Sequence, residues 1–273
     1  MAFDMGNTLN TSMEKLIGIV ATLRGPDGCP WDKDQTPQTL QPFLVEETYE
    51  VLDSLESSDW CGLKEELGDL LFQIVLHSQI MKEAGEFDIS DVIDVICKKM
   101  ERRHPHVFGD SEAKNAEAVR AQWSKIKAME RRERAKGTDG SDYSVLGGVP
   151  LAAPALIQAQ RLGEKAASVG FDWLSAKDVF QKVEEEVVEL SAELMNENKS
   201  YQEHELGDLL FTLTNLARHL GIDSESSLRK ANKRFNKRFR YIEQKVSDNN
   251  NDIETTPAAR LEELWLEAKQ KLG

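Results

Sequence analysis

Two clusters of acidic residues contain the side chains in this sequence that are best suited to chemistry. Each has the pattern Glu-Glu-x-x-Glu, followed further along by Glu-x-x-Asp. The first cluster comprises Glu46, Glu47, Glu50, Glu66 and Asp69, and the second comprises Glu185, Glu186, Glu189, Glu205 and Asp208. Residues three or four positions apart share a face of an α-helix, so two adjacent helices could bring these carboxylates together. Oxygen ligands gathered in this way suit Mg²⁺ or Mn²⁺.

The mutual repulsion of these carboxylates calls for a compensating partner. Two carboxylates about 4 Å apart repel by roughly 4 kcal/mol at an effective dielectric constant of about 20. Basic neighbours, raised pKa values or hard cations could cancel the charge, and we favour the cation over a structural salt-bridge network. A carboxylate diiron bundle is a close competitor. However, both clusters have Asp where the Glu-x-x-His of that bundle has His.

The second helix of each cluster is expected to bury its carboxylates in part. Glu66 shares its face with Asp69, Gln73 and His77, while leucine, isoleucine, valine and phenylalanine fill most of the other positions. The second copy repeats this narrow polar stripe. Buried carboxylates without compensation are costly, so an ordinary solvated face explains these helices poorly.

An internal repeat sets the organisation of the chain. The segment at 46–72 recurs at 185–211 with a constant offset, since 186 − 47 and 208 − 69 both equal 139. Such a repeat is typical of a duplicated structural unit. We predict an N-terminal helical domain over 1–136, a linker rich in Gly, Ser and Asp over 137–150, and a C-terminal helical domain over 151–273.

The elements that position the clusters are predicted to be helical throughout, which makes the fold class all-α with two tandem helical bundles. Apolar spacing predicts helices at about 38–57, 60–84, 89–103, 116–134, 153–168, 176–197 and 224–247. Three capping patterns predict helix starts near 12, 201 and 257: Thr11 with Glu14, Ser200 with Glu203, and Thr256 before Pro257.

Composition narrows the possible classes of protein. The 273 residues carry a formal net charge of −14, which disfavours binding to a nucleic acid polymer or an anionic membrane surface. No apolar run approaches the roughly 20 residues needed to span a bilayer. The N-terminus has no secretory signal, and three widely spaced cysteines suit reduced thiols, so we expect a cytoplasmic protein.

The paired acidic motifs and their flanks resemble the all-α nucleotide pyrophosphatase superfamily. The stretches GPDGCPWDKDQT, RRHPHVFGD and KAASVGFDW are similar to segments typical of the two-domain MazG family, and the resemblance covers nearly the whole chain. It implies a helical bundle that pairs as a homodimer and hydrolyses nucleoside triphosphates to monophosphate and pyrophosphate with Mg²⁺, or Mn²⁺ as a substitute. Broad specificity and a role in clearing the nucleotide pool or controlling stress nucleotides are expected.

The resemblance also implies roles for the clustered carboxylates. In the second cluster, Glu185 would orient or activate water, and Glu46 is its counterpart in the first cluster. The remaining acidic residues of each cluster would hold the metal: Glu186, Glu189, Glu205 and Asp208, and likewise Glu47, Glu50, Glu66 and Asp69.

Basic and aromatic residues near the C-terminus match the nucleotide contacts of the family. Arg234 and Arg238 lie one turn apart, and we expect the neighbouring Phe235 and Phe239 to face the core. The full set of expected substrate contacts in the second half is Lys182, Tyr201, Arg234, Arg238, Trp265 and Lys269. The first half offers Lys99, Arg103, Trp123 and Lys127.

The two halves differ at two positions close to the clusters. Phe43 replaces Lys182, and Gly62 replaces Tyr201. We therefore expect the C-terminal half to be the main catalytic centre, with the first half a second site of different preference or a structural and regulatory copy. The alternative from another class is a non-catalytic helical scaffold that senses nucleotides or binds a protein partner.

Overall fold

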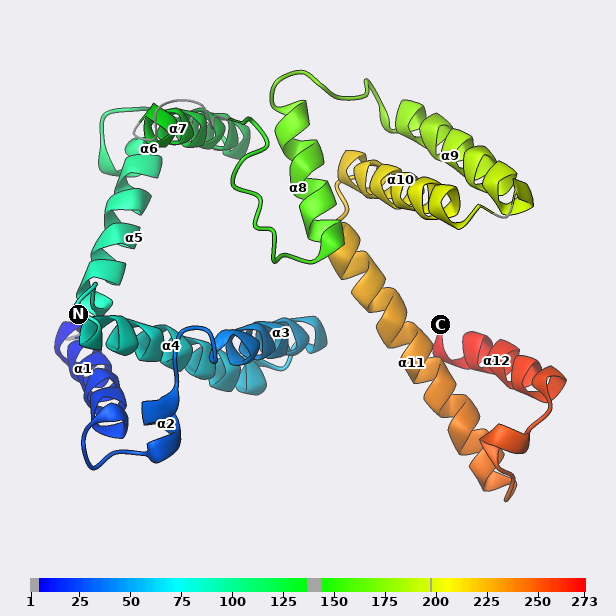
Figure 1. Ribbon diagram of the computed structural model, residues 1–273, viewed down its shortest axis with the longest axis horizontal. Coiled ribbons are helices and arrows are strands. Elements are labelled where there is room, and N and C mark those ends of the chain that lie inside the picture. The colour runs from blue at the N-terminus through cyan, green and yellow to red at the C-terminus, as the bar shows by residue number, and fades with distance from the viewer. Residues whose placement is uncertain (1–4, 137–143, 197) are drawn as a thin grey trace. The chain divides into compact units, whose positions relative to one another are not determined.

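The protein consists of two compact helical units. The computed structural model describes residues 5–136, 144–196 and 198–273, and the elements in these ranges are helices without a strand (Figure 1). Unit 1 spans Met1–Glu130 and unit 2 spans Arg131–Gly273. The all-α class is therefore confirmed. The predicted linker over 137–150 stays a prediction, and its residues 137–143 lie outside the described ranges.

Unit 1 contains a helical hairpin with the first acidic cluster, and further helices precede and follow it. Its helices are α1 (Met5–Arg24), α2 (Pro30–Asp34), α3 (Gln41–Ser57), α4 (Trp60–Glu83), α5 (Ile89–Arg103), α6 (Pro105–Phe108) and α7 (Ala116–Lys136), which continues past the boundary between the units. The α3–α4 hairpin carries the first acidic cluster.

Unit 2 repeats this hairpin and ends in a second helical pair. Its elements are α8 (Ala155–Ala167), α9 (Ala176–Asn196), α10 (Lys199–His219), α11 (Ser224–Asp248), the 3-10 helix η1 (Ile253–Thr255) and α12 (Ala258–Leu272). The α9–α10 hairpin carries the second cluster, and α12 folds back along the C-terminal half of α11 (Figure 1).

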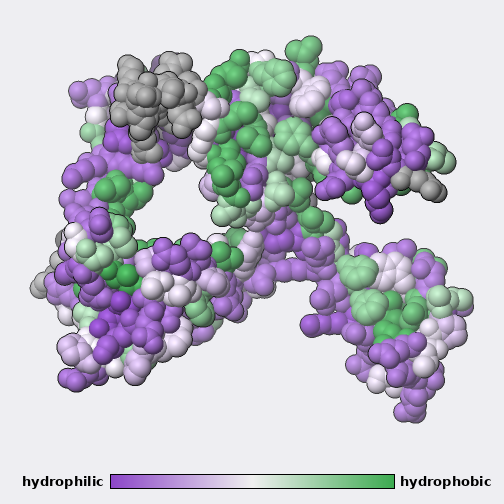
Figure 2. All heavy atoms as spheres, in the orientation of Figure 1, coloured by the Kyte–Doolittle hydropathy of each residue, from purple (hydrophilic) through white to green (hydrophobic). Residues whose placement is uncertain are grey.

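Both hairpins leave large apolar side chains exposed. On α3 and α4, Val45, Leu67 and Ile74 are 53%, 49% and 41% exposed, and on α10, Leu206 and Leu210 are exposed to about the same extent as Leu67. Figure 2 shows hydrophobic residues open at the surface between hydrophilic ones. Apolar area of this kind gains about 25 cal/mol for each Å² that is removed from water, so these faces favour a covering partner.

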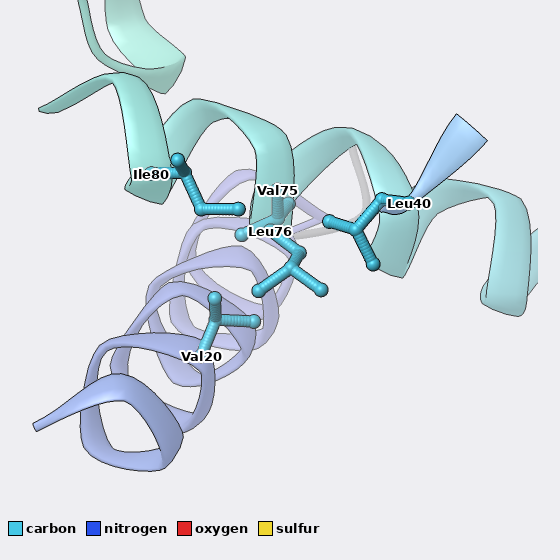
Figure 3. Close-up of a cluster of buried hydrophobic side chains, with 5 residues drawn as sticks. All are labelled: Val20, Leu40, Val75, Leu76 and Ile80. Carbon is cyan, nitrogen blue, oxygen red and sulfur yellow. The ribbon is translucent and has the colours of Figure 1, made fainter. Parts of the chain in front are cut away.

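The core of unit 1 holds α4 against α1. Val20, Leu40, Val75, Leu76 and Ile80 are buried together, from α1, the residue before α3, and the middle of α4 (Figure 3). This packing fixes the C-terminal half of α4, and the acidic residues of α4 lie in its N-terminal half. The core therefore anchors the C-terminal half of α4, and the carboxylates lie on the half that is nearer the turn to α3.

Local capping fixes the turn between α3 and α4. Ser58 ends α3 in the left-handed conformation with φ 57°, and Asp59 accepts hydrogen bonds from the backbone N–H groups of Cys61 and Gly62. A Cβ added at Gly62 would lie 2.7 Å from the Asp59 carboxylate. A side chain here would require the Asp59 carboxylate to shift.

In unit 2, a close approach joins α8 to α10, and an ion-pair cluster joins the loop before α9 to the end of α10. A Cβ added at Gly163 of α8 would lie 2.3 Å from the side-chain oxygen of the buried Asn215 on α10. Asp172, in the loop before α9, accepts hydrogen bonds from Arg218 and contacts His219 at 2.9 Å. These contacts hold the loop that leads into α9 against α10.

Three predicted helix starts differ from the structure. α1 already includes Thr11, and α10 begins at Lys199 with Asn198 as its N-cap, whose side chain accepts from the N–H of Ser200. α12 begins at Ala258 after Pro257, while the Thr256 hydroxyl donates to the Asp252 carbonyl. The short helices α2 and α6 were not predicted, because proline-led single turns leave no apolar period to detect. No helix in the described ranges is long and apolar enough to span a bilayer.

Candidate functional site

The first acidic cluster gathers carboxylates from both helices of its hairpin. One carboxylate oxygen from each of Glu47, Glu66 and Asp69 lies within 4.8 Å of the others. Partial burial, followed by the charge of Asp69, raises the pKa of Glu47. Partial burial and the neighbouring Glu50 raise the pKa of Glu66. The predicted companions Glu46 and Glu50 add to the repulsion on Glu47, so this cluster is short of positive charge.

The second cluster has the same geometry and contains a lysine. Oxygens of Glu186, Glu205 and Asp208 lie within 4.8 Å of one another, and the Glu186 side chain is only 6% exposed. The Lys182 ammonium lies 2.7 Å from Glu185, 3.0 Å from Glu186 and 3.9 Å from Glu189. Hydrogen bonds with Glu185 and Glu186 hold the pKa of Lys182 above its usual value, so this ammonium stays charged at neutral pH.

A histidine missed in the sequence analysis joins the second cluster. The Nδ1 atom of His204 lies 2.9 Å from an Asp208 oxygen. A hydrogen bond to its own backbone, and then the charge of Asp208, raise the pKa of His204. The spacing of four residues along one helix was the signal that could have identified it. The corresponding residue in unit 1 is Glu65, so the histidine is specific to the second cluster.

Both clusters have a donor set that fits a hard divalent cation. Their three convergent ligands are all carboxylate oxygens, and no cysteine or histidine takes part in either triad. Oxygen-only ligands suit Mg²⁺, Ca²⁺ or Mn²⁺ rather than zinc. Burial first, and then the charge of neighbouring carboxylates, raise the pKa values of Glu47 and Glu66, and a bound cation would offset the second effect.

A polar cavity lies on α11 and α12. Its volume is about 350 Å³, and it is lined by Ala231, Asn232, Arg234, Phe235, Arg238 and Trp265. The Arg238 guanidinium lies over the Trp265 ring at 5.7 Å, and Arg238 also donates to the Gly273 carbonyl. Two arginines beside an exposed aromatic cavity wall can bind phosphate oxygens and a flat ring.

The expectation that Phe235 and Phe239 face the core was wrong. They are 57% and 38% exposed, and their rings stack on each other at 5.9 Å. Phe235 also contacts the Trp265 ring at 5.3 Å. The core of this helical pair comes instead from Ile242 and Val246 of α11 and from Leu264 of α12, because the cavity occupies the part of α11 nearer its start.

Within the described residues of unit 2, the cavity and the acidic cluster lie on different helices. The carboxylates lie on α9 and α10, whereas the main packing of α12 is against α11. No hydrogen bond or ion pair within the described ranges links Arg234, Arg238 or Trp265 to the cluster. Of the other expected contacts, Tyr201 and Lys269 are exposed on α10 and α12, and Lys182 alone touches the carboxylates.

Unit 1 has a related group of residues on α5 and α7. The Lys127 ammonium lies 5.3 Å from the Trp123 ring, much as Arg238 lies over Trp265. Arg103 pairs with the nearly buried Glu130 at 2.6 Å, and Arg102 pairs with it at 2.7 Å. Lys99 is half-buried on α5. The arginine of unit 1 thus pairs with a side-chain carboxylate.

Two further histidines, His77 and His104, make local contacts. Nδ1 of His77 lies 2.8 Å from the Gln73 carbonyl, and Nδ1 of His104 lies 2.7 Å from the Met100 carbonyl. His104 also meets the Trp123 ring edge-on at 4.9 Å. These contacts agree with packing and capping roles.

Comparisons with known proteins place the chain in a family. The model of the MazG nucleotide pyrophosphohydrolase domain matches residues 35–108, and that of phosphoribosyl-ATP pyrophosphohydrolase matches residues 160–235. The nucleoside triphosphate pyrophosphohydrolase of Escherichia coli K12 is 43% identical over 262 residues, which cover 95% of this chain and 97% of that protein.

Two further relatives also match more than nine-tenths of this chain. The nucleoside triphosphate pyrophosphohydrolase/pyrophosphatase MazG of Thermotoga maritima is 41% identical, covering 94% of this chain and 95% of that protein. An uncharacterized Bacillus subtilis protein, YabN, is 42% identical over 92% of this chain and 50% of its own length. The chain belongs to the MazG family of nucleoside triphosphate pyrophosphohydrolases.

Proposed function

We propose that the protein hydrolyses ribo- or deoxyribonucleoside triphosphates between the α and β phosphates, with Mg²⁺, to give a nucleoside monophosphate and pyrophosphate. The observation that carries this proposal is the convergence of Glu186, Glu205 and Asp208 within 4.8 Å, with Lys182 beside them. The names of the relatives, which describe nucleoside triphosphate pyrophosphohydrolases, support the same reaction.

The second cluster is the proposed main catalytic centre. Glu186, Glu189, Glu205 and Asp208 would hold Mg²⁺. When bound, the ion neutralises the triphosphate, lowers the pKa of bound water and stabilises the departing pyrophosphate. Glu185 is exposed and lies at the edge of the cluster, where its carboxylate can accept a proton from an attacking water. The Lys182 ammonium lies 2.7 Å from that carboxylate.

Nucleotide recognition is assigned to the cationic and aromatic residues of unit 2. Arg234 and Arg238 bind phosphate oxygens, and Trp265 stacks on the base at the cavity. Lys182, Tyr201 and Lys269 supply further contacts to the triphosphate. Guanidinium groups suit this role because their planar donors match phosphate oxygens.

The first cluster is proposed to act as a second site with its own preference or as a structural and regulatory copy. Glu47, Glu50, Glu66 and Asp69 are its proposed metal ligands, and Glu46 is the counterpart of Glu185. Lys99, Arg103, Trp123 and Lys127 are the proposed nucleotide contacts of this half. The ion pair between Arg103 and Glu130 makes this half less suited to bind a triphosphate, which supports the main role of unit 2.

A homodimer is the proposed working assembly. Both acidic hairpins expose apolar side chains, such as Leu67 on α4 and Leu206 on α10, and a second copy would cover them. Sedimentation equilibrium should therefore give about twice the chain mass of 30.8 kDa, whereas a monomer at micromolar concentration would refute this assembly. Broad base specificity and a role in clearing aberrant or stress nucleotides complete the proposal.

Product analysis tests the reaction. The protein is incubated with each ribo- and deoxyribonucleoside triphosphate, once with Mg²⁺ and once with excess chelator, and products are resolved by ³¹P NMR. We expect monophosphate and pyrophosphate only with Mg²⁺, and near-complete loss in Asp208→Asn. Diphosphate and phosphate would mean a different scission site. No turnover of any nucleotide would favour the sensing scaffold.

A further inference from the structure

The two acidic clusters differ in the residue one turn before their first metal-binding glutamate. Lys182 stands four positions before Glu186, and Phe43 stands four positions before Glu47. Lys182 places its ammonium 3.0 Å from the Glu186 carboxylate and also reaches Glu185 and Glu189. The second cluster therefore holds the positive charge of Lys182, and His204 also contacts its Asp208 at 2.9 Å.

Phe43, at the equivalent position of unit 1, brings no charge to the first cluster. Its ring packs against the buried core of the unit and meets the Trp31 ring edge-on at 5.6 Å. No positive charge reaches the first cluster from this position. The oxygens of Glu47, Glu66 and Asp69 lie within 4.8 Å of one another, as do those of the second cluster, so similar triads carry unequal charge.

This difference changes the net charge that surrounds a divalent cation at each cluster. At the first, the ion meets carboxylates that repel one another, and binding relieves that repulsion. At the second, the ion must share or displace the ammonium that already pairs with Glu186. The Glu186 side chain is only 6% exposed, so water can replace Lys182 there only in part, and the competition is direct.

A triphosphate would remove this competition. Its oxygens offer Lys182 a new anionic partner within reach of the cluster, which leaves the Glu186 carboxylate for the metal. The first cluster needs no such exchange, because Phe43 has no charge to move. The cation and the nucleotide should therefore bind cooperatively at the second cluster.

We propose, on the basis of the function proposed above, that Lys182 and Phe43 set the metal affinity of their clusters. The first cluster binds a divalent cation tightly without nucleotide. The second cluster binds the free ion weakly and binds it tightly only together with a triphosphate. Lys182 thus couples metal binding to substrate binding.

Mn²⁺ titration followed by electron paramagnetic resonance tests this proposal on the full chain without nucleotide. We expect one tight and one weak class of site, with the tight class lost in Glu66→Gln and the weak class lost in Glu205→Gln. Lys182→Met should tighten the weak class by about tenfold or more, because it removes one charge at ion-pair distance. Lys177→Met, which changes an exposed lysine of the same helix, is the matched control and should leave both classes unchanged.

Phe43→Lys supplies the reciprocal change and should weaken the tight class by about tenfold. Because this substitution also disturbs packing, the result from Lys182→Met stands independently of it. Adding the non-hydrolysable analogue adenosine 5′-(α,β-methylene)triphosphate should tighten the weak class of the unaltered protein far more than that of Lys182→Met.

Unchanged Mn²⁺ affinity in Lys182→Met, or a tight class that is lost in Glu205→Gln rather than in Glu66→Gln, would overturn the inference. The titration measures Mn²⁺ affinity and is independent of nucleotide hydrolysis. A protein that binds Mn²⁺ as described and releases no pyrophosphate would therefore refute the proposed reaction and leave this inference standing.

Discussion

Replacing Glu130 by glutamine should destabilise unit 1 by an amount that depends on pH. Glu130 joins α7 to α5 through ion pairs with Arg102 and Arg103 at 2.7 and 2.6 Å, and its side chain is 10% exposed. Hydrogen bonds from Arg103, followed by those from Arg102, lower the pKa of Glu130 from 4.5 to about 2. At about 1.4 kcal/mol for each pH unit, this difference corresponds to roughly 3 kcal/mol of stability.

The sign follows from the lowered pKa. The carboxylate stabilises the folded state at every pH above about 4.5, and that contribution is lost as the pH falls from about 4.5 towards 2. Arg102 is half exposed, so solvent screens part of its interaction. We therefore expect Glu130→Gln to lower the free energy of unfolding by about 2–3 kcal/mol at pH 7.

Urea unfolding followed by circular dichroism measures this difference at pH 7, 5, 4 and 3. The gap between the unaltered protein and Glu130→Gln should be constant from pH 7 to 5 and then shrink steadily at lower pH. Glu133→Gln, at an exposed position on the same helix, should change stability by less than about 0.5 kcal/mol. A gap that is absent at pH 7, or that grows on acidification, would refute the reasoning.

Two further variants test unit 2. Trp265→Ala should raise KM for nucleoside triphosphates by about tenfold with a smaller change in kcat, because stacking on a base is worth about 1–3 kcal/mol. Steady-state kinetics measure both constants. Trp265→Phe should retain part of the affinity, because its ring can still stack. Asp172→Asn should lower the thermal unfolding temperature, because Arg218 and then His219 hold the pKa of Asp172 below its usual range and their pairing would be lost. The Asp172 effect should fade on acidification below about pH 4, and a thermal shift that persists there would speak against it.

The sequence predicted the acidic clusters well because their geometry is local. Residues such as Glu66 and Asp69 share a helix face by spacing alone, and the repeat made the partner helix evident. The structure indeed brings Glu47 to that pair and Glu186 to its counterpart. Each of these contacts spans a single hairpin, so helical periodicity was sufficient.

Helical periodicity could not predict features that depend on packing between helices. Phe235 and Phe239 have core-like spacing, yet Ile242 and Val246 form the core instead, since the return path of α12 decides which part of α11 is covered. That path depends on contacts between distant segments, which periodicity does not encode. Likewise, the pairing of Arg103 with Glu130 joins separate helices and had no local signal.

The most direct test of the central claim compares two matched variants in one assay. Glu186→Gln and Glu47→Gln alter equivalent glutamates of the two clusters, and monophosphate release from a good substrate is measured with saturating Mg²⁺ after circular dichroism has verified both folds. Glu186→Gln should lose roughly a hundredfold or more in activity, and Glu47→Gln should change it much less. Full turnover in Glu186→Gln, together with loss in Glu47→Gln, would contradict this claim and assign catalysis to the first cluster.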